Sequence, residues 1–261
     1  MGHVLAIDQG TTSTRAIVFD KAGQPGASVA RPLNQIFPEP GWVEHDPDEI
    51  WRAVCEVCGA VVGEVGAANI VAIGITNQRE TTVVWDRATG APLHNAIVWQ
   101  DRRTAPLCEE LEREGWGAHV TDVTGLLIDP YFSATKLAWL LANVSGLREK
   151  AARGEVCFGT IDSFLLFKLT GGQLHTTDAT NAARTMLFDI RKGLWDPLLL
   201  DRLGIPPDML PEVRDTLGDF GQTDGEAFGV VLPIRGVAGD QQAAAKGQAC
   251  VRPSMIKATY G

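Results

Sequence analysis

The order of apolar and polar positions predicts three β-strands at the start of the chain. The stretch from Val4 to Asp20 has the pattern of two strands joined by a Gly/Thr/Ser turn, which is typical of a β-hairpin. A third strand is predicted at Ala27–Leu33, after a turn rich in glycine and proline.

The period then changes from two residues to three or four, which predicts a helix. Asp46 is placed to cap it, Pro47 suits its first position, and Asp48 and Glu49 suit the positive end of the helix dipole. Apolar residues recur on one predicted face, at Ile50, Val54, Val57 and Val61.

Short apolar runs alternate with helical segments along the rest of the chain. Ile70–Ile75 is almost continuously apolar, as expected for a strand covered on both faces. Further strands are predicted at Val83–Asp86 and Ala96–Trp99. Helices are predicted at Thr104–Glu114, Thr135–Asn143, Ser163–Leu169 and Leu198–Leu203.

The last part of the chain repeats the change from strand to helix. A strand at Ile234–Gly239 leads through Asp240 into an alanine-rich helix, Gln241–Gln248, and one more strand is predicted at Met255–Tyr260. Before it, 221–232 has the pattern of a surface loop. Three adjacent strands followed by alternating helices and strands predict an α/β fold with a mixed central sheet flanked by helices. A ribonuclease-H-like or actin-like ATPase domain has that order.

The composition of the chain limits the kinds of partner it could bind and the cellular compartment in which it is expected. The 261 residues are 45% hydrophobic, enough for a substantial core, and the net charge of −9 argues against a nucleic-acid partner. No signal peptide or membrane-spanning run is expected. The five cysteines match no metal-site spacing and cannot all pair, so a cytoplasmic location is expected. Cys55 and Cys58 lie within a helical pattern, which favours packing over redox chemistry.

The turn of the first hairpin is the first candidate site. Backbone N–H groups and hydroxyls of the Gly10–Ser13 turn could bind a phosphate, and Arg15 would add a cation. Asp8 could hold a magnesium ion through water. An ordinary hairpin turn with no ligand is the alternative.

A second group of candidates follows the later strands. Arg79, Glu80 and Trp99 together offer a donor, an acceptor and an apolar wall, the three properties that a polyol needs. A surface salt bridge beside a core tryptophan would have the same residue types. Tyr131 could lend its hydroxyl to a ligand or pack on its proline-containing turn.

The third candidate is Asp240, at the junction between the last long strand and its helix. An aspartate there could accept the proton of an attacking hydroxyl during phosphoryl transfer. It could equally be the N-cap of the helix, and the sequence leaves both roles open.

Together these segments resemble the glycerol kinases of the FGGY carbohydrate kinase family over almost the whole chain. The resemblance is greatest in stretches with the sequences AIDQGTTS (6–13), PGWVEHDP (40–47), GITNQRETT (74–82), NAIVWQ (95–100), DPYFS (129–133) and GDQQA (239–243). The first and last are shared with xylulose and gluconate kinases, whereas TNQRET and DPYFS narrow the resemblance to glycerol.

The resemblance implies an ATP- and Mg²⁺-dependent phosphorylation of glycerol to glycerol 3-phosphate. It implies that Asp240 is the general base, and that the glycerol-binding residues are Arg79, Glu80, Trp99, Tyr131, Asp240 and Gln241. It implies that the nucleotide phosphates contact Thr11, Thr12, Ser13 and Arg15, with Asp8 near magnesium. Alternatives are a kinase for another polyol or ketose and a non-catalytic ligand-binding module.

The resemblance also implies how the chain is divided. Residues 1–247 would be the N-terminal substrate-binding domain, and residues 248–261 the start of a truncated C-terminal nucleotide-binding domain that carries the adenine pocket. The chain alone would then have little or no kinase activity. A homo-oligomer would be expected of the full-length enzyme, with glycerol and ATP/ADP as its partners.

Overall fold

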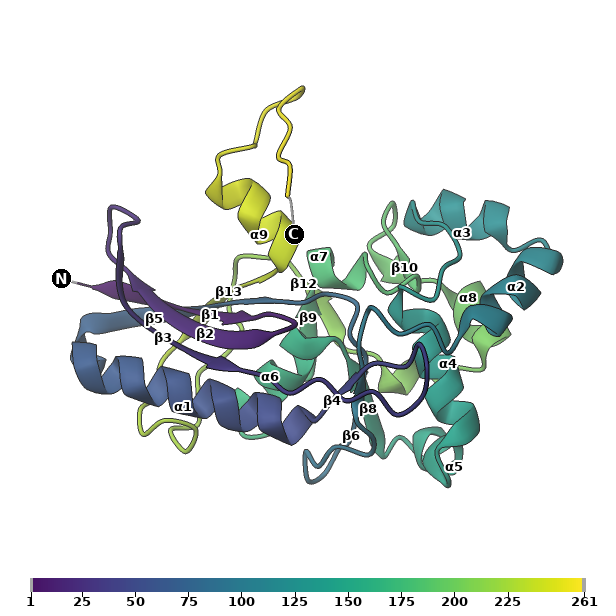
Figure 1. Cartoon of the computed structure of the whole chain (residues 1–261), viewed down its shortest axis with the longest axis horizontal. Coiled ribbons are helices and arrows are strands. Elements are labelled where there is room, and N and C mark those ends of the chain that lie inside the picture. The colour runs from purple at the N-terminus through teal and green to yellow at the C-terminus, as the bar shows by residue number, and fades with distance from the viewer. Residues whose placement is uncertain (1, 260–261) are drawn as a thin grey trace.

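A five-stranded mixed sheet forms the centre of the structure, in the order β13-β5-β1-β2-β3. The computed structural model describes residues 2–259. The sheet consists of β1 (His3–Gln9), β2 (Ser13–Phe19), β3 (Pro25–Pro32), β5 (Ile70–Asn77) and β13 (Ile234–Gly239). β1 runs antiparallel to β2 and parallel to β5, and β13 is parallel to β5 on its other side. The carboxyl ends of β1, β5 and β13 therefore lie at one edge of the sheet (Figure 1).

The long helix α1 (Pro47–Val65) packs along one face of this sheet, as its apolar period predicts (Figure 1). The Asp46 carboxylate accepts a hydrogen bond from the Asp48 N–H, so the predicted cap is confirmed. α6 (Ile161–Leu169) contacts β5 and adds Phe164 and Leu165 to the same core. Cys55 and Cys58 are free thiols on α1, and Cys58 is fully buried, which confirms packing there.

The other helices form a lobe beside the sheet, with a second apolar core (Figure 1). Its helices are α2 (Ala105–Arg113), α3 (Gly117–Thr124), α4 (Ser133–Asn143), α5 (Leu147–Ala152) and α8 (Pro197–Leu203). Short strands form four two-stranded sheets outside the central sheet: β4 (Glu44–His45) with β7 (Ala96–Ile97), β6 (Val83–Asp86) with β8 (Val156–Gly159), β9 (Thr176–Asp178) with β12 (Glu212–Arg214), and β10 (Phe188–Asp189) with β11 (Leu194–Trp195). The remaining elements are α7 (Ala179–Ala182), α9 (Asp240–Gly247) and the 3₁₀ turns at Ala67–Asn69 and Pro207–Met209.

The structure corrects three of the predictions. β5 is not covered on both faces, since Val71 is 55% exposed and Gly74 and Thr76 are only half-buried; α6 packs against the strand. The strand expected at Ala96–Trp99 ends at Ile97, where its pairing with the two-residue β4 ends. Residues 255–259 form no strand, because no described strand pairs with them, and Tyr260 lies outside the described residues. The mixed α/β fold itself is confirmed.

Candidate active site

The first side of the candidate site is the turn between β1 and β2. The Gly10 N–H donates to the Ser13 carbonyl at 2.9 Å, which closes the turn. A Cβ atom at Gly10 would lie 3.2 Å from that carbonyl oxygen, so a glycine keeps the turn this tight. Thr11 and Ser13 are half-buried, and Thr12 is exposed. Two of the three hydroxyl residues thus have only part of their surface open to solvent.

Asp8 and Arg15 face each other across the hairpin as a cross-strand pair. Burial raises the pKa of Asp8, the Arg15 guanidinium opposes that rise, and the Asp240 carboxylate adds to it. β1 and β13 both run parallel to β5, on its two sides. The ends of β1 and β13 are therefore on the same side of the sheet edge.

The second side is built by Arg79 and Glu80, directly after β5. The Arg79 Nε atom lies 3.0 Å from Asp240 Oδ1, and its Nη2 atom lies 3.8 Å from Glu80 Oε1. The Arg79 N–H is not well aligned with Asp240, so their contact is an ion pair without a formed hydrogen bond. Arg79 thus bridges two carboxylates that follow different strands of the sheet, Glu80 after β5 and Asp240 after β13.

Trp99 and Tyr131 close the site from the helical lobe. Their rings lie 5.3 Å apart, and the Trp99 Nε1–H donates to the Thr11 hydroxyl at 2.8 Å. Burial raises the pKa of Tyr131, and the nearby Glu80 carboxylate raises it further. The Tyr131 ring also packs against Phe132 at 5.3 Å. Tyr131 therefore packs on its turn and lies beside Glu80 at the same time.

Asp240 is the first residue of α9, and Gly239 is its N-cap. The N-cap role that the sequence left open for Asp240 is therefore wrong. Its Oδ1 atom accepts from the Gln241 N–H at 2.6 Å, and 40% of its side chain is exposed. The carboxylate has open surface beside Arg79, as a group that receives a proton from a bound alcohol would need.

Gln241 is a predicted glycerol-binding residue that the structure does not bring into contact with Arg79, Glu80 or Tyr131. It is exposed, and its Oε1 atom accepts from the Lys257 ammonium group at 2.8 Å. The neighbouring Gln242 is turned to Arg79, whose Nη1 donates to its Oε1 atom at 3.4 Å. The sequence singled out the first of two adjacent glutamines, and this structure places the second in contact.

Known proteins resemble this chain in sequence and in fold. Residues 3–247 match the FGGY family of carbohydrate kinases, N-terminal domain. The chain belongs to the FGGY family. It is 60% identical to a glycerol kinase of Cereibacter sphaeroides, over all of this chain and 53% of that protein. The chain thus spans about half the length of the curated relatives it matches.

Solved FGGY structures have the same fold. A Plasmodium falciparum glycerol kinase crystallised with ADP matches all of this chain and 53% of its own, with a TM-score of 0.95 and 37% identity. A ligand-bound xylulose kinase from Lactobacillus acidophilus matches 95% of this chain and 50% of its own, with a TM-score of 0.86 and 25% identity. The actin-like fold expected from the sequence is confirmed.

Arg184 is a residue of the candidate site that the sequence did not reveal. Its Nε atom donates to Glu80 Oε1 at 2.7 Å, and its guanidinium carbon lies 5.0 Å from the centre of the Phe132 ring. Glu80 is buried between Arg79 and Arg184, so two cations keep its carboxylate compensated. No local pattern marks Arg184, because it follows a helix of only four residues.

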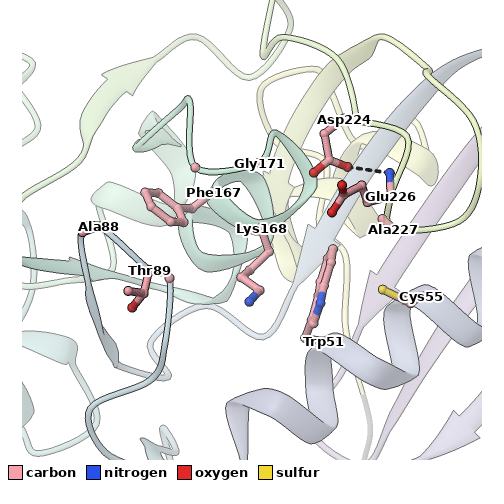
Figure 2. Close-up of a pocket in the computed structure, with 12 residues that line it drawn as sticks. Trp51, Cys55, Ala88, Thr89, Phe167, Lys168, Gly171, Asp224, Glu226 and Ala227 are labelled. Atoms are coloured by element: carbon pink, nitrogen blue, oxygen red, sulfur yellow. Dashed lines mark hydrogen bonds between the residues drawn. The ribbon is translucent and has the colours of Figure 1, made fainter.

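One cavity borders the candidate site, and another lies apart from it. One, of about 650 Å³, lies between the open face of the sheet and α9, and its walls include Thr76, Thr180 and Gln242 beside the cluster. The other, of about 440 Å³, lies between α1, α6 and the loop after β12 (Figure 2). None of the predicted site residues lines that second cavity, so we give it no part in the chemistry.

Magnesium fits the charge at Asp8 and Asp240. Within residues 2–259, no three His, Cys, Asp or Glu side chains are grouped as a metal cage. Magnesium commonly binds to one or two carboxylates and completes its shell with water and substrate phosphates. Asp8, near the end of β1, and Asp240, just after β13, could supply those carboxylates.

Proposed function

We propose that this chain is the glycerol-binding half of an ATP-dependent glycerol kinase, which forms glycerol 3-phosphate. The observation that carries the proposal is the ion pair between Arg79 and Asp240, which follow separate strands, at a sheet edge where Trp99 bonds to Thr11. The 60% identity to a glycerol kinase supports glycerol as the acceptor.

In this proposal, glycerol hydroxyls bind to Arg79, Glu80 and Tyr131, and the glycerol carbons lie against the Trp99 ring. The planar Arg79 guanidinium donates hydrogen bonds in a fixed geometry, and the Glu80 carboxylate accepts them. The Trp99 indole offers an apolar surface. A bound triol would therefore have a defined orientation. Gln241 would join these residues only after releasing Lys257, and it is proposed here with that condition.

The terminal hydroxyl would be oriented toward Asp240, which accepts its proton as the oxygen attacks phosphorus. Arg79 holds the base in place through the ion pair between its Nε atom and Asp240 Oδ1. The main contribution of these residues is to orient the acceptor, because phosphoryl transfer depends mostly on alignment and on compensation of charge.

The nucleotide side of the proposal rests on the turn between β1 and β2. Phosphate oxygens would bind to Thr11, Thr12, Ser13 and Arg15. Magnesium, held through Asp8, would neutralise charge on the phosphates. The Trp99 to Thr11 hydrogen bond would then connect the acceptor and the phosphate sides.

We also propose that residues 1–247 act as the substrate-binding domain and that residues 248–261 begin the nucleotide-binding domain. The extent of the family match, 3–247, supports the first boundary. Phosphoryl transfer by this chain alone is then expected to be slow or absent. No helix between residues 2 and 259 combines the length and apolar character needed to cross a bilayer. A cytoplasmic location remains part of the proposal.

Ligand binding to the purified chain tests the proposal. Thermal unfolding would be followed with glycerol, dihydroxyacetone, xylulose and gluconate, each over a range of concentrations, because a ligand that binds the folded state raises Tm. Glycerol should give the largest shift, and Asp240→Asn should reduce it. A larger shift with xylulose would favour a ketose kinase, an alternative that the xylulose kinase similarity keeps open.

A further inference from the structure

A buried polar network connects the carboxyl ends of β5 and β13, behind the candidate site. It begins at Asn77, the last residue of β5, which is fully buried. The Asn77 Nδ2 donates to Asn181 Oδ1 at 3.0 Å, and the Asn181 Nδ2 donates back to Asn77 Oδ1 at 3.2 Å. The strand that leads into Arg79 is therefore tied to the short helix α7.

The Asp178 carboxylate is the centre of this network. It is fully buried, and it accepts from the Asn181 N–H at 3.0 Å and from the Thr216 hydroxyl at 2.8 Å. The Thr180 hydroxyl also donates to Asp178 Oδ2, at 2.7 Å. Hydrogen bonds to a charged group are shorter and stronger than those between neutral groups. Asp178 therefore fixes the direction in which the Thr180 hydroxyl points.

Because its hydrogen is directed to Asp178, the Thr180 oxygen is free to accept. It accepts from the Gly239 N–H at 2.8 Å. Gly239 is the N-cap of α9, and the next residue is Asp240. The network thus ends one residue before the proposed base.

Two further observations show that this last hydrogen bond bears on the position of Asp240. No residue of α9 is buried, so little apolar packing holds the helix in place. A Cβ atom at Gly239 would lie 2.6 Å from Arg79 Cδ, so the Arg79 side chain packs directly on the Gly239 backbone. The contact between Arg79 and Gly239 therefore depends on the position of the end of β13, which the network fixes.

We propose that Thr180, oriented by Asp178, is a positioning residue that holds Asp240 against Arg79 in the geometry that receives the acceptor alcohol. The inference rests on the proposed function, since it gives Asp240 its role there. Thr180 is not proposed to touch substrate; it acts through the backbone of Gly239.

The test compares Thr180→Val, which keeps the shape and removes the hydroxyl, with Thr180→Ser, which keeps the hydroxyl. Glycerol affinity of the purified chain is measured by calorimetry. Thr180→Val should weaken binding about five- to tenfold, the effect of one lost hydrogen bond, and Thr180→Ser should restore affinity to near the wild-type value. In the Asp240→Asn background Thr180→Val should weaken binding much less, because it acts through the same carboxylate.

Thr223→Val is a matched control. The Thr223 hydroxyl accepts from the Leu232 N–H at 2.9 Å, in the loop after β12, as the Thr180 hydroxyl accepts from a backbone N–H. Thr223 is buried and Thr180 is half-buried. Its loss should cost a similar amount of stability and leave glycerol affinity unchanged. Equal loss of affinity in both variants would show that Thr180 has a general structural role, and would overturn the inference.

Amide hydrogen exchange separates this inference from the proposed function. Thr180→Val should speed exchange at Gly239 and in the first turn of α9, and Thr180→Ser should not. If the wild-type chain binds no glycerol, the proposed function fails, and the exchange data still decide whether Thr180 holds α9. Unchanged exchange in Thr180→Val, or full additivity with Asp240→Asn, would refute the positioning role.

Discussion

Arg79 follows one parallel strand and Asp240 follows its neighbour, and their charged groups meet with Nε and Oδ1 3.0 Å apart. The contact is possible because β5 and β13 pair in register up to Asn77 and Gly239. Arg79 is the more enclosed partner, with 12% of its side chain exposed against 40% for Asp240. The guanidinium is therefore fixed, and the carboxylate faces the opening of the site.

Arg79→Ala should weaken glycerol binding at least tenfold, which is about 1.4 kcal/mol. The change removes a donor for the ligand and also the cation that lies between Glu80 and Asp240. Calorimetry on the purified chain measures the glycerol affinity. Arg31→Ala serves as the control, because Arg31 pairs with Glu56 on the surface, with both side chains about half exposed, and should not matter to affinity. Equal affinity in the two variants would contradict the assignment of Arg79.

The sheet-side elements could be predicted from sequence because each has a strong local signal. The Asp46-Pro47 start of α1 is an example, since the cap and the period agree. The same holds for Ile234–Gly239 and α9, where an apolar run is followed by an alanine-rich segment. Strands of two residues, such as β10 and β11, give no measurable period and were missed.

Only part of the candidate site could be predicted from the sequence. Residues at strand ends were found because parallel strands end at a common edge. Arg184 and Thr180 were missed because their partners, Glu80 and Gly239, are distant in sequence and no motif links them. The sequence also could not predict the direction in which a side chain points. Gln241 and Gln242 are the same residue type, and only the structure shows which one contacts Arg79.

Trp99→Phe should loosen the turn between β1 and β2 without removing the aromatic wall. The variant loses the Nε1–H donor to Thr11, a contribution of about 1 kcal/mol. Amide exchange at residues 10–13 should become faster, and glycerol affinity should fall less than threefold. Trp51→Phe is the comparison, since Trp51 lies on α1 at the separate cavity (Figure 2). Unaltered exchange in Trp99→Phe would show that the bond does not order the turn.

Lys136→Met should destabilise the chain by about 2 to 4 kcal/mol and reduce glycerol affinity. Lys136 is fully buried on α4, and its ammonium group donates to the carbonyls of Pro130, Tyr131 and Phe132. Methionine fills the space but leaves these carbonyls without a donor. The backbone of Tyr131 would then be less well fixed. Urea unfolding and calorimetry check the two effects, and undiminished stability would contradict the account.

Lys136 also predicts a rise in stability in alkali. Burial lowers its pKa to about 7, although nearby carboxylates such as Asp101 and Glu80 oppose this. Between pH 7 and about 10.5 the unfolded chain therefore binds more protons at this residue than the folded chain, so the free energy of unfolding increases with pH. Lys136→Met should lack this increase. If the free energies of unfolding of the two proteins changed with pH in parallel, this role of Lys136 would be ruled out.

Asp162 predicts the opposite slope in mild acid. It is fully buried, and its pKa is raised to about 6. Burial is the main cause and the nearby Asp178 carboxylate the second, while hydrogen bonds from Thr160 and Thr177 oppose the rise. The folded chain thus binds more protons than the unfolded chain from about pH 4 to pH 6, and the free energy of unfolding falls over that interval. About 2 to 3 kcal/mol of stability contributed by Asp162 below pH 4 is lost by pH 7.

Asp162→Asn isolates this effect from the titration of other carboxyl groups. Asparagine keeps the shape, and the Thr160 and Thr177 hydroxyls can each turn to donate or accept. Measured by urea unfolding at pH 4, 5, 6 and 7, the stability of Asp162→Asn relative to wild type should rise steadily across the series. Because Asp162 lies 3.5 Å from the Asn77 amide at the start of the network behind the site, glycerol affinity of the wild type should also be compared at pH 5 and 7. A constant stability difference between the two proteins at all four pH values would show that Asp162 does not titrate in this range.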